Sequence, residues 1–404
     1  MRILIAPDKF KGTLSAREVS EAITAGLRDA LPDAKIGILP LADGGEGTAE
    51  VISQALSGSW LSCKTQDPLG REIDARYAWV DDQQLAIMEM SEAAGMRRLQ
   101  SDELNPEITG TFGVGKMILD AAKCGAQEII IGLGGSATND GGVGMARALG
   151  FRFLNKSELE IQIPVDLVAL ERILPSPQSS LLGRGSREAA GDGKSFPNII
   201  AAVDVRNPLL GENGATRVFG PQKGATQLEK LEAALTRLAD IVAKQFGIDY
   251  RNEPGAGAAG GLGFGLVSFC GATIRPGFDV VAESVGLEAK IRNVDLVITG
   301  EGSLDRQTLE GKTPAGVARL ARKYGKRVFA FVGRATEDRQ VLQLFDGVYQ
   351  NQRLGMSMDE NVKHAAEILR DNARQFARDF EEKLILNVQR PTPNERGRIR
   401  PNSL

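Results

Sequence analysis

Histidine is almost absent from this chain, whose 404 residues include only His364. A zinc site built from histidines, or a serine–histidine–aspartate triad, therefore lacks its usual residues. Cysteine is scarce too, because Cys63, Cys124 and Cys270 lie far apart and no C-x-x-C spacing occurs. Neither a disulfide framework nor a thiolate metal site is expected, and a reducing compartment fits best. Carboxylates, hydroxyls, lysines and backbone amides remain, which are the groups that phosphoryl transfer uses.

Long apolar runs and a large net charge are also missing. In the opening MRILIAPDKF, four apolar residues and a proline precede Asp8, and no later apolar run reaches the roughly 18 residues of a membrane span. The net charge is only −3, which argues against a protein that coats nucleic acid or an anionic membrane. We expect a cytoplasmic protein with small-molecule partners, no nucleic acid and no membrane.

One glycine-rich stretch, IIIGLGGSATNDGGVGMARALG over residues 129–150, stands out. An apolar run of strand character leads into Gly134 and Gly135, and further glycines precede a helix of small residues. Glycines allow close approach of the backbone to a phosphate, and a helix N-terminus adds about half a positive charge. The stretch therefore predicts a phosphate-binding turn, with a purely structural strand-to-helix connection as the alternative.

Strands and helices alternate along both ends of the chain. Residues 3–6 and 35–39 predict strands, and Ser15 with Glu18 predicts a capping box at the start of a helix. The same alternation returns at residues 294–299 and 328–332. We therefore predict an α/β fold in which one parallel-sheet domain, residues 1–67 plus 285–387, is interrupted by an inserted domain, residues 68–284, with a ligand cleft between them.

Other segments complete this division. Extended runs on both sides of Asp81 and Asp82 predict a hairpin, and Thr226 with Glu229 predicts a second capping box. A long helix is expected over residues 358–385. Residues 176–195 and the tail 388–404 lack apolar periodicity, so we expect a mobile loop and a disordered end.

Two familiar motifs fit only in part. GTFGVGK at residues 110–116 has the spacing of a P-loop, but Met117 follows where a hydroxyl should bind the metal. Gly255, Gly257 and Gly260 satisfy G-x-G-x-x-G, yet RNEP precedes them instead of a buried strand. We therefore interpret the first as no P-loop and the second as a close-packed helix start.

Several stretches together resemble the bacterial glycerate kinase family, type I: APDKFKGTLSA, PLADGGEGT, GLGGSATNDGG, FGPQKGA, GAGAAGGLGFGL and ITGEGSLDRQTLEGKTPAGVA. The resemblance covers residues 2 to about 383 and implies a flavodoxin-like domain interrupted by a second α/β domain. It also implies ATP-dependent phosphorylation of D-glycerate to 2-phosphoglycerate. The loop 176–195, the sequence GRATEDRQ and the arginine-rich tail depart from the family pattern.

Candidate roles follow from this resemblance and from residue chemistry. Asp43 and Asp204 are candidates to bind Mg²⁺ or accept the hydroxyl proton, although a turn-capping role is an alternative for Asp204. Lys9 and Lys11 are candidates for the carboxylate of glycerate or the transferred phosphoryl group, with solvated surface lysines as the alternative. The candidates for the ATP phosphates are Gly134, Gly135, Ser136, Thr138, Asn139 and Lys223, and those that complete the substrate site are Glu301, Asp305 and Lys312. An ordinary Pro-Gly turn is the alternative for the segment of Lys223, and capping of the next turn is the alternative for Glu301.

Other functions remain open at this point. Without the family resemblance, the residues do not choose between the 2-hydroxyl and the 3-hydroxyl of glycerate. A dinucleotide-dependent oxidoreductase and a non-catalytic sensor of phosphorylated metabolites are the alternatives to a kinase.

Overall fold

The computed structural model describes residues 1–176, 196–310, 312–353 and 355–388. Contacts divide the chain into two units, one formed by Met1–Pro40 and Glu288–Leu404 and the other by Leu41–Leu287. We call them the terminal unit and the central unit. Residues 177–195 of the predicted loop and 389–404 of the predicted tail lie outside the described residues. No helix in the described ranges has the length and apolar character needed to cross a bilayer.

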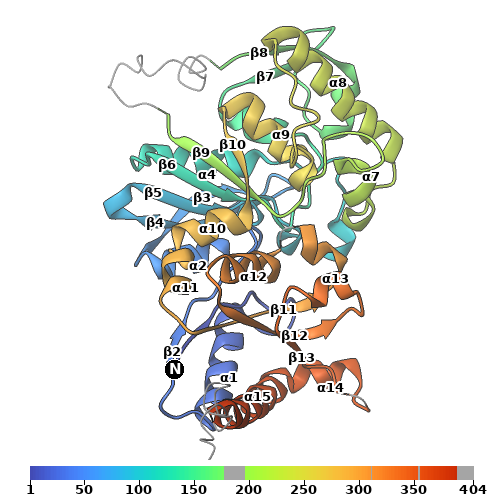
Figure 1. Cartoon of the computed structure of the whole chain (residues 1–404). Helices are drawn as coiled ribbons and strands as arrows, with labels where there is room; N and C mark the ends of the chain where they lie inside the picture. Colours follow the sequence, from blue (N-terminus) through green and yellow to red (C-terminus); the bar gives the residue numbers. More distant parts are fainter. Residues whose placement is uncertain (177–195, 311, 354, 389–404) are drawn as a thin grey trace, which may run out of the picture. The chain divides into compact units, whose positions relative to one another are not determined.

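The terminal unit contains a five-stranded parallel sheet of order β13-β12-β11-β1-β2. Counted along the unit, this order is 2-1-3-4-5, which is that of flavodoxin-like folds. Figure 1 shows the N-terminal strand beside strands from the far end of the chain. The strands are β1 (Arg2–Ile5), β2 (Lys35–Ile38), β11 (Leu296–Leu304), β12 (Arg327–Ala335) and β13 (Gly347–Gln350). The expected α/β fold with a parallel sheet from both chain ends is confirmed.

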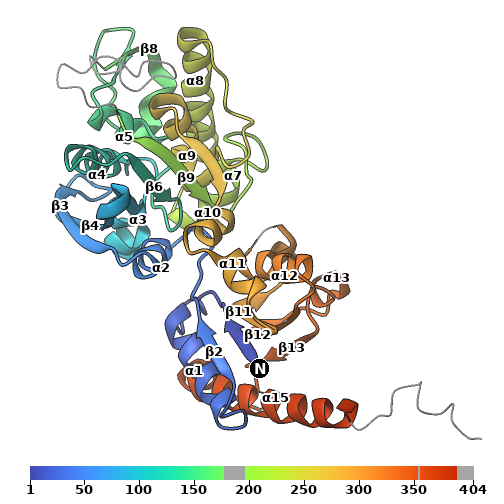
Figure 2. The same ribbon diagram turned by 60° about the vertical axis from the view of Figure 1, so that its left-hand side comes forward.

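Helices of the terminal unit form where the sequence supplies caps and an apolar face. The predicted capping box is present, since Ser15 accepts from the amide of Glu18 and the Glu18 carboxylate accepts from the amide of Ser15. Helix α1 packs against α15, and the backbones approach so closely that a Cβ on Gly26 would lie 2.1 Å from the carbonyl oxygen of Arg370 (Figure 2). The helices are α1 (Ala16–Arg28), α12 (Thr313–Lys323), α13 (Arg339–Leu342), α14 (Met358–Lys363), α15 (Ala365–Val388), the 3-10 helix η6 (Arg306–Glu310) and α11 (Leu287–Arg292), which starts at the division.

The core of the terminal unit lies between its sheet and the helices α1 and α15. The ring of Phe376 on α15 packs edge-on to Phe331 on β12, with ring centroids 5.7 Å apart. The single long helix expected over residues 358–385 is interrupted at His364, where α14 ends and α15 begins. This side chain is 44% exposed and contacts Glu367.

The central unit contains a six-stranded mixed sheet of order β10-β9-β6-β5-β4-β3. Strands β5, β6, β9 and β10 run parallel, whereas β4 pairs antiparallel with both β3 and β5. The hairpin predicted at Asp81 and Asp82 is therefore confirmed. The strands are β3 (Ser59–Gln66), β4 (Glu72–Val80), β5 (Leu85–Glu89), β6 (Glu128–Gly132), β9 (Asn198–Val203) and β10 (Thr273–Pro276), with a separate pair β7 (Arg152–Asn155) and β8 (Leu170–Leu174).

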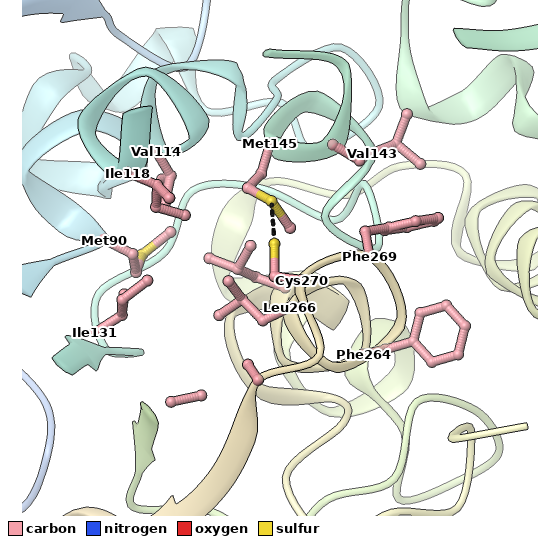
Figure 3. Close-up of a cluster of buried hydrophobic side chains, with 14 of the residues drawn as sticks. Met90, Val114, Ile118, Ile131, Val143, Met145, Phe264, Leu266, Phe269 and Cys270 are labelled. Carbon is pink, nitrogen blue, oxygen red and sulfur yellow. Dashed lines mark hydrogen bonds between the residues drawn. The ribbon is translucent and has the colours of Figure 1, made fainter. Parts of the chain in front are cut away.

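Helices cover this sheet and enclose an apolar core. Figure 3 shows Met145 of α5 meeting Cys270 of α9, whose thiol donates to the methionine sulfur at 3.5 Å. Burial raises the pKa of the Cys270 thiol to about 12, so it packs as a neutral apolar group. The helices are α2 (Thr48–Ala55), α3 (Ser91–Ala94), α4 (Phe112–Lys123), α5 (Val143–Ala148), α7 (Ala215–Phe219), α8 (Leu228–Phe246), α9 (Ala258–Cys270) and α10 (Gly277–Ser284). The 3-10 helices are η1 (Asp81–Gln83), η2 (Met96–Arg98), η3 (Ser101–Glu103), η4 (Pro164–Ala169) and η5 (Pro221–Lys223).

Two sequence-based predictions differ from the structure. The central unit begins at Leu41 rather than at residue 68, because α2 contacts β4 and β5 and β3 pairs with β4 along its whole length. The capping box predicted at Thr226 is wrong. Gln227 is the N-cap of α8, and the buried carboxylate of Glu107 accepts from the amide and hydroxyl of Thr226 and from the amide of Gln227. The carboxylate of Glu107, distant in the sequence, thus accepts the hydrogen bonds that were expected for the carboxylate of Glu229.

Candidate functional site

The predicted phosphate-binding turn follows β6 at the carboxyl edge of the parallel strands, where ligands of such sheets bind. Gly135 has φ +69°, a left-handed conformation that glycine adopts without steric cost. Gly134 and Gly135 are half-buried, and their amides donate to no residue that the structure describes. These two N–H groups are therefore available to an anion.

The first amides of the helix after this turn are hydrogen-bonded within the protein, a feature that the sequence-based prediction did not include. The buried carboxylate of Asp140 accepts from the amides of Gly142 and Gly144 at 2.9 Å each and from the amide and hydroxyl of Thr111 at 2.8 Å each. The Thr111 hydroxyl in turn accepts from the amide of Met145 at 2.9 Å. The first amides of α5 are thus already satisfied, and the helix has only six residues.

Lys223 points into the turn from η5. Its side chain is 2% exposed, and Nζ donates to the carbonyl oxygen of Thr138 at 2.7 Å and to Oγ of Ser136 at 3.2 Å. Desolvation lowers the pKa of this amine to about 7, against the opposing charge of Asp140. An ammonium has three N–H groups, so the geometry leaves one for a phosphate oxygen.

Asn139 adds an unpaired acceptor to the same turn. Its side chain is buried, Nδ2 donates to Oγ1 of Thr216 at 3.0 Å, and Oδ1 has no hydrogen-bond partner. A buried amide oxygen without a partner costs about 1–3 kcal/mol. Such a cost is offset when a ligand or water donates to the oxygen.

The loop that carries Asp43 lies directly against this turn. A Cβ on Gly134 would come within 2.8 Å of the Cα of Gly45, and Oδ1 of Asp43 accepts from the amide of Gly45 at 3.1 Å. Glu89 at the end of β5 accepts from the amide of Gly47 at 2.8 Å and so holds the start of α2. The sequence placed Asp43 in the same domain as Lys9 and Lys11, but the structure places it in the central unit.

Asp204 follows β9 directly and is exposed. Gly44 packs against Ala202 of the same strand, since a Cβ on Gly44 would lie 3.2 Å from the carbonyl carbon of Ala202. The loop of Asp43 and the residue Asp204 thus belong to the same sheet edge. Within the described ranges, no group of three or more His, Cys, Asp or Glu side chains is arranged to hold a metal by itself.

A second group of candidates lies at the carboxyl edge of the terminal sheet. Glu301 on β11 is 8% exposed, and its Oε1 accepts from Oγ1 of Thr308 at 2.9 Å. Burial raises the pKa of Glu301 to about 7, with Asp8 and Asp305 adding to the effect and Lys312 and Thr308 opposing it. Lys312 contacts Asp305 at 3.6 Å.

The loop after β1 lies beside this group. Asp8 is buried and accepts from the amide of Lys9 at 2.7 Å and from Oγ1 of Thr313, the first residue of α12, at 2.7 Å. Lys9 is half-buried and Lys11 is exposed. The candidates therefore form two groups. The carboxyl edge of the sheet in the terminal unit carries Lys9, Lys11, Glu301, Asp305 and Lys312. The carboxyl edge of the sheet in the central unit carries Asp43, Asp204, Lys223 and the glycine turn.

Some residues that build these sites were missing from the sequence-based candidates. Asp140, Asp8 and Glu89 are buried carboxylates that hold backbone or hydroxyl donors of the loops. Asp8 and Glu89 follow apolar runs, which is the one signal that marks them in the sequence. Thr216 and Thr308 carry no such signal, because their partners are Asn139 and Glu301.

The motifs that fitted only in part have packing roles. Gly113, in the P-loop-like stretch, lies in α4, where a Cβ would come within 2.0 Å of the carbonyl oxygen of Gln66. Gly255 and Gly257 follow a turn rather than a strand, and Gly260 lies at the start of α9. A nucleotide-binding βαβ unit is therefore absent from this part of the chain, residues 251–270.

Comparisons with known proteins identify the family of this chain. The model of the glycerate kinase family matches residues 3–381. A glycerate kinase of Bacillus subtilis (strain 168) is 40% identical over 384 residues, which cover 93% of this chain and 97% of the relative. A glycerate 2-kinase of Escherichia coli (strain K12) is 40% identical over 342 residues, which cover 84% of this chain and 86% of the relative.

A solved structure matches as well. The crystal structure assigned to glycerate kinase 2 of Salmonella typhimurium LT2 superposes with a TM-score of 0.80 at 39% identity, and the match covers 95% of this chain and 99% of that one. Family model, relatives and fold lead to the same conclusion: the chain is a kinase that belongs to the glycerate kinase family.

Proposed function

We propose that this kinase transfers the γ-phosphoryl group of ATP to D-glycerate and releases 2-phosphoglycerate and ADP. The observation that carries the proposal is the turn at Gly134–Gly135, where two unpaired amides and the buried amine of Lys223 offer donors to phosphate oxygens. The relative from Escherichia coli that is named a glycerate 2-kinase supports the choice of the 2-hydroxyl.

The proposal assigns ATP to the central unit and glycerate to the terminal unit. Gly134, Gly135, Ser136, Thr138, Asn139 and Lys223 would hold the triphosphate. Lys9 and Lys11 would meet the carboxylate or the transferred group, and Asp305 and Lys312 would border the acceptor.

Mg²⁺ fits the carboxylates at the central sheet edge. Mg²⁺ prefers oxygen ligands and is often held by one or two carboxylates together with substrate phosphates. Asp43 is half-buried with one oxygen on the amide of Gly45, and Asp204 is exposed, so both can offer a carboxylate oxygen. The ion would neutralise charge on the β- and γ-phosphates.

A coupled assay tests the proposed function. ADP release should depend on both D-glycerate and ATP, and enolase added to the product should act without a mutase only if the phosphate is on the 2-hydroxyl. A need for the mutase would show that 3-phosphoglycerate is the product. ADP release that is unaffected by glycerate would refute the substrate assignment.

Removal of divalent cations should abolish turnover. Excess EDTA is expected to lower kcat by more than about 100-fold, because stabilising the phosphoryl charge is most of what such a kinase does. Added Mg²⁺ should restore the rate. Full turnover in EDTA would contradict the role given to Asp43 and Asp204.

Glycerol, which lacks the carboxylate, should be a poor substrate. Hydrogen bonds to charged groups are worth about 1.5–3 kcal/mol, so kcat/KM should be at least about tenfold lower than for D-glycerate. Lys11→Ala should reduce this discrimination, because the loss of the cation penalises glycerate more than glycerol. The measurement is kcat/KM for both substrates on both proteins.

Lys35→Ala is the matched control, since Lys35 is an exposed lysine of β2 in the same unit. It should leave the ratio of the two substrates unchanged. Glycerol used within threefold of glycerate by the unmodified protein would exclude a carboxylate anchor. An unchanged ratio in Lys11→Ala would move the anchor to Lys9 or Lys312.

A further inference from the structure

Glu301 occupies an unusual place for a carboxylate. It lies inside β11, a central strand of the terminal sheet, and pairs in register with Val332 of β12. Its side chain is 8% exposed. Burial of a carboxylate is unfavourable unless hydrogen bonds compensate it. Asp140 and Glu107 each accept at least three hydrogen bonds, whereas within the described ranges Glu301 accepts one, from Thr308. A buried carboxylate with so few donors is a candidate for chemistry.

The hydrogen bonds of Glu301 leave one oxygen for a substrate. Oγ1 of Thr308 accepts from the amide of Asp305 at 3.1 Å, so its single proton is directed to Oε1 of Glu301 at 2.9 Å. Within the described ranges, no residue donates to Oε2 of Glu301. Oε1 is therefore fixed, whereas Oε2 can accept a proton.

Charged residues lie on the elements that neighbour Glu301. Asp8 comes from the loop after β1, and Asp305 and Lys312 come from the segment around η6. Arg334 on β12 bonds to Ser303, and the backbone of Lys11 lies near Gly302, where a Cβ would be 3.3 Å from the Lys11 amide. Burial raises the pKa of Glu301 to about 7, with Asp8 and Asp305 adding to the effect and Lys312 and Thr308 opposing it. A pKa near neutral pH suits a general base.

The neighbouring carboxylates are less suited to this role. The two oxygens of Asp8 accept from the amide of Lys9 and from Oγ1 of Thr313, so Asp8 holds the start of α12. Asp305 is 41% exposed and contacts Lys312. Glu301 thus combines burial, a fixed oxygen and an accessible oxygen beside the loop of Lys9 and Lys11.

We propose that Glu301 is the general base that takes the proton from the hydroxyl of glycerate during phosphoryl transfer. The hydroxyl proton passes to Oε2, the hydroxyl oxygen bonds to the γ-phosphorus, and the bond from this phosphorus to the β–γ bridging oxygen breaks with its electron pair on ADP. This inference rests on the proposed function and gives the base role to a residue other than Asp43 or Asp204.

The test compares Glu301→Gln with the unmodified protein at saturating Mg²⁺ over pH 5.5–9. The kcat of the variant should fall by at least about 100-fold, with KM for ATP and glycerate within threefold. For the unmodified protein, kcat/KM for glycerate should fall about tenfold per pH unit below about 7, and this acid limb should vanish in the variant. Glu337→Gln is the matched control, because Glu337 is an exposed carboxylate in the segment after β12. It should leave the profile unchanged.

Thr308→Val supplies a second, milder variant if Glu301→Gln does not fold. The threonine hydroxyl stabilises the ionised carboxylate, so its loss should move the acid limb upward by at least about half a pH unit, with kcat above pH 8 within threefold. A role for Glu301 that is only structural would shift the melting temperature but not this limb.

The outcomes separate the two proposals. An unmodified protein without glycerate-dependent ADP release would refute the proposed function itself. An active protein whose Glu301→Gln variant keeps kcat within tenfold, or whose acid limb stays in place in either variant, would overturn the assignment of the base alone.

Discussion

Gly260→Ala should lower kcat/KM for ATP by about 100-fold and destabilise the central unit. A Cβ on Gly260 would lie 1.9 Å from the carbonyl oxygen of Thr138, the atom to which Lys223 donates. The turn must move to admit the methyl group, and a displacement of about 1 Å at a reacting site can cost a factor of about 10² in rate. The measurements are steady-state kinetics with ATP and urea denaturation.

Gly247→Ala is a matched control for the effect of backbone conformation. Gly247 and Gly260 have the same φ of +68°, but a Cβ on Gly247 would meet nothing within 4 Å. Its replacement should cost about 1–2 kcal/mol of stability and leave the kinetics unchanged. The residue before Gly260, Ala259, already adopts φ +54° with a side chain, so the clash rather than the dihedral angle distinguishes the two sites. Normal ATP kinetics in Gly260→Ala would show that this turn does not bind ATP.

Lys223→Met should weaken ATP binding by about 10- to 100-fold. The variant removes the N–H group of Lys223 that is proposed to donate to a phosphate oxygen, together with its bonds to the Thr138 carbonyl oxygen and the Ser136 hydroxyl. Hydrogen bonds from charged groups are worth about 1.5–3 kcal/mol. Lys230→Met, at an exposed position of α8, is the control and should bind ATP normally. Equal affinity of the two variants for ATP would restrict Lys223 to a structural role.

The pH dependence of Lys223 gives a second readout. Its pKa is about 7 in the folded protein and 10.5 as the ordinary value, so between these values the unfolded chain binds the extra proton. Stability should therefore rise with pH over this range, and Lys223→Met should remove that rise. Phosphate oxygens favour the ammonium form, so ATP binding at pH 8 should take up protons. Calorimetry in buffers of different ionisation enthalpy would detect this uptake, and its absence in the unmodified protein would contradict contact with phosphate.

Much of the fold could be predicted from local sequence patterns. The capping box of Ser15 and Glu18, the hairpin at Asp81 and Asp82 and the strand before the glycine turn all formed as expected. Each of these depends on apolar periodicity or on hydrogen bonds between residues a few positions apart. Such interactions are visible in the sequence because their partners are neighbours along the chain.

The candidate site could be predicted only as a list of residues. Glu229 does not form the predicted capping box. The amides of Thr226 and Gln227 donate to Glu107, which is distant in the sequence, and Glu229 pairs with Arg217. The amides at the start of α5, which were expected to face an anion at the glycine turn, donate instead to Asp140 and Thr111. Competition between near and distant partners is decided by folding, which sequence spacing does not record.

The sequence by itself determined the α/β class, the positions of the glycine turn and the charged loops, and the scarcity of histidine and cysteine. Only the tertiary structure decided that the loop of Asp43 belongs with the glycine turn, that Lys223 points inward and that Glu301 is buried with one oxygen held by Thr308. The physical reason is that burial and hydrogen bonding across the fold set the charge state and orientation of these groups, whereas residue type and spacing set only where they enter the chain.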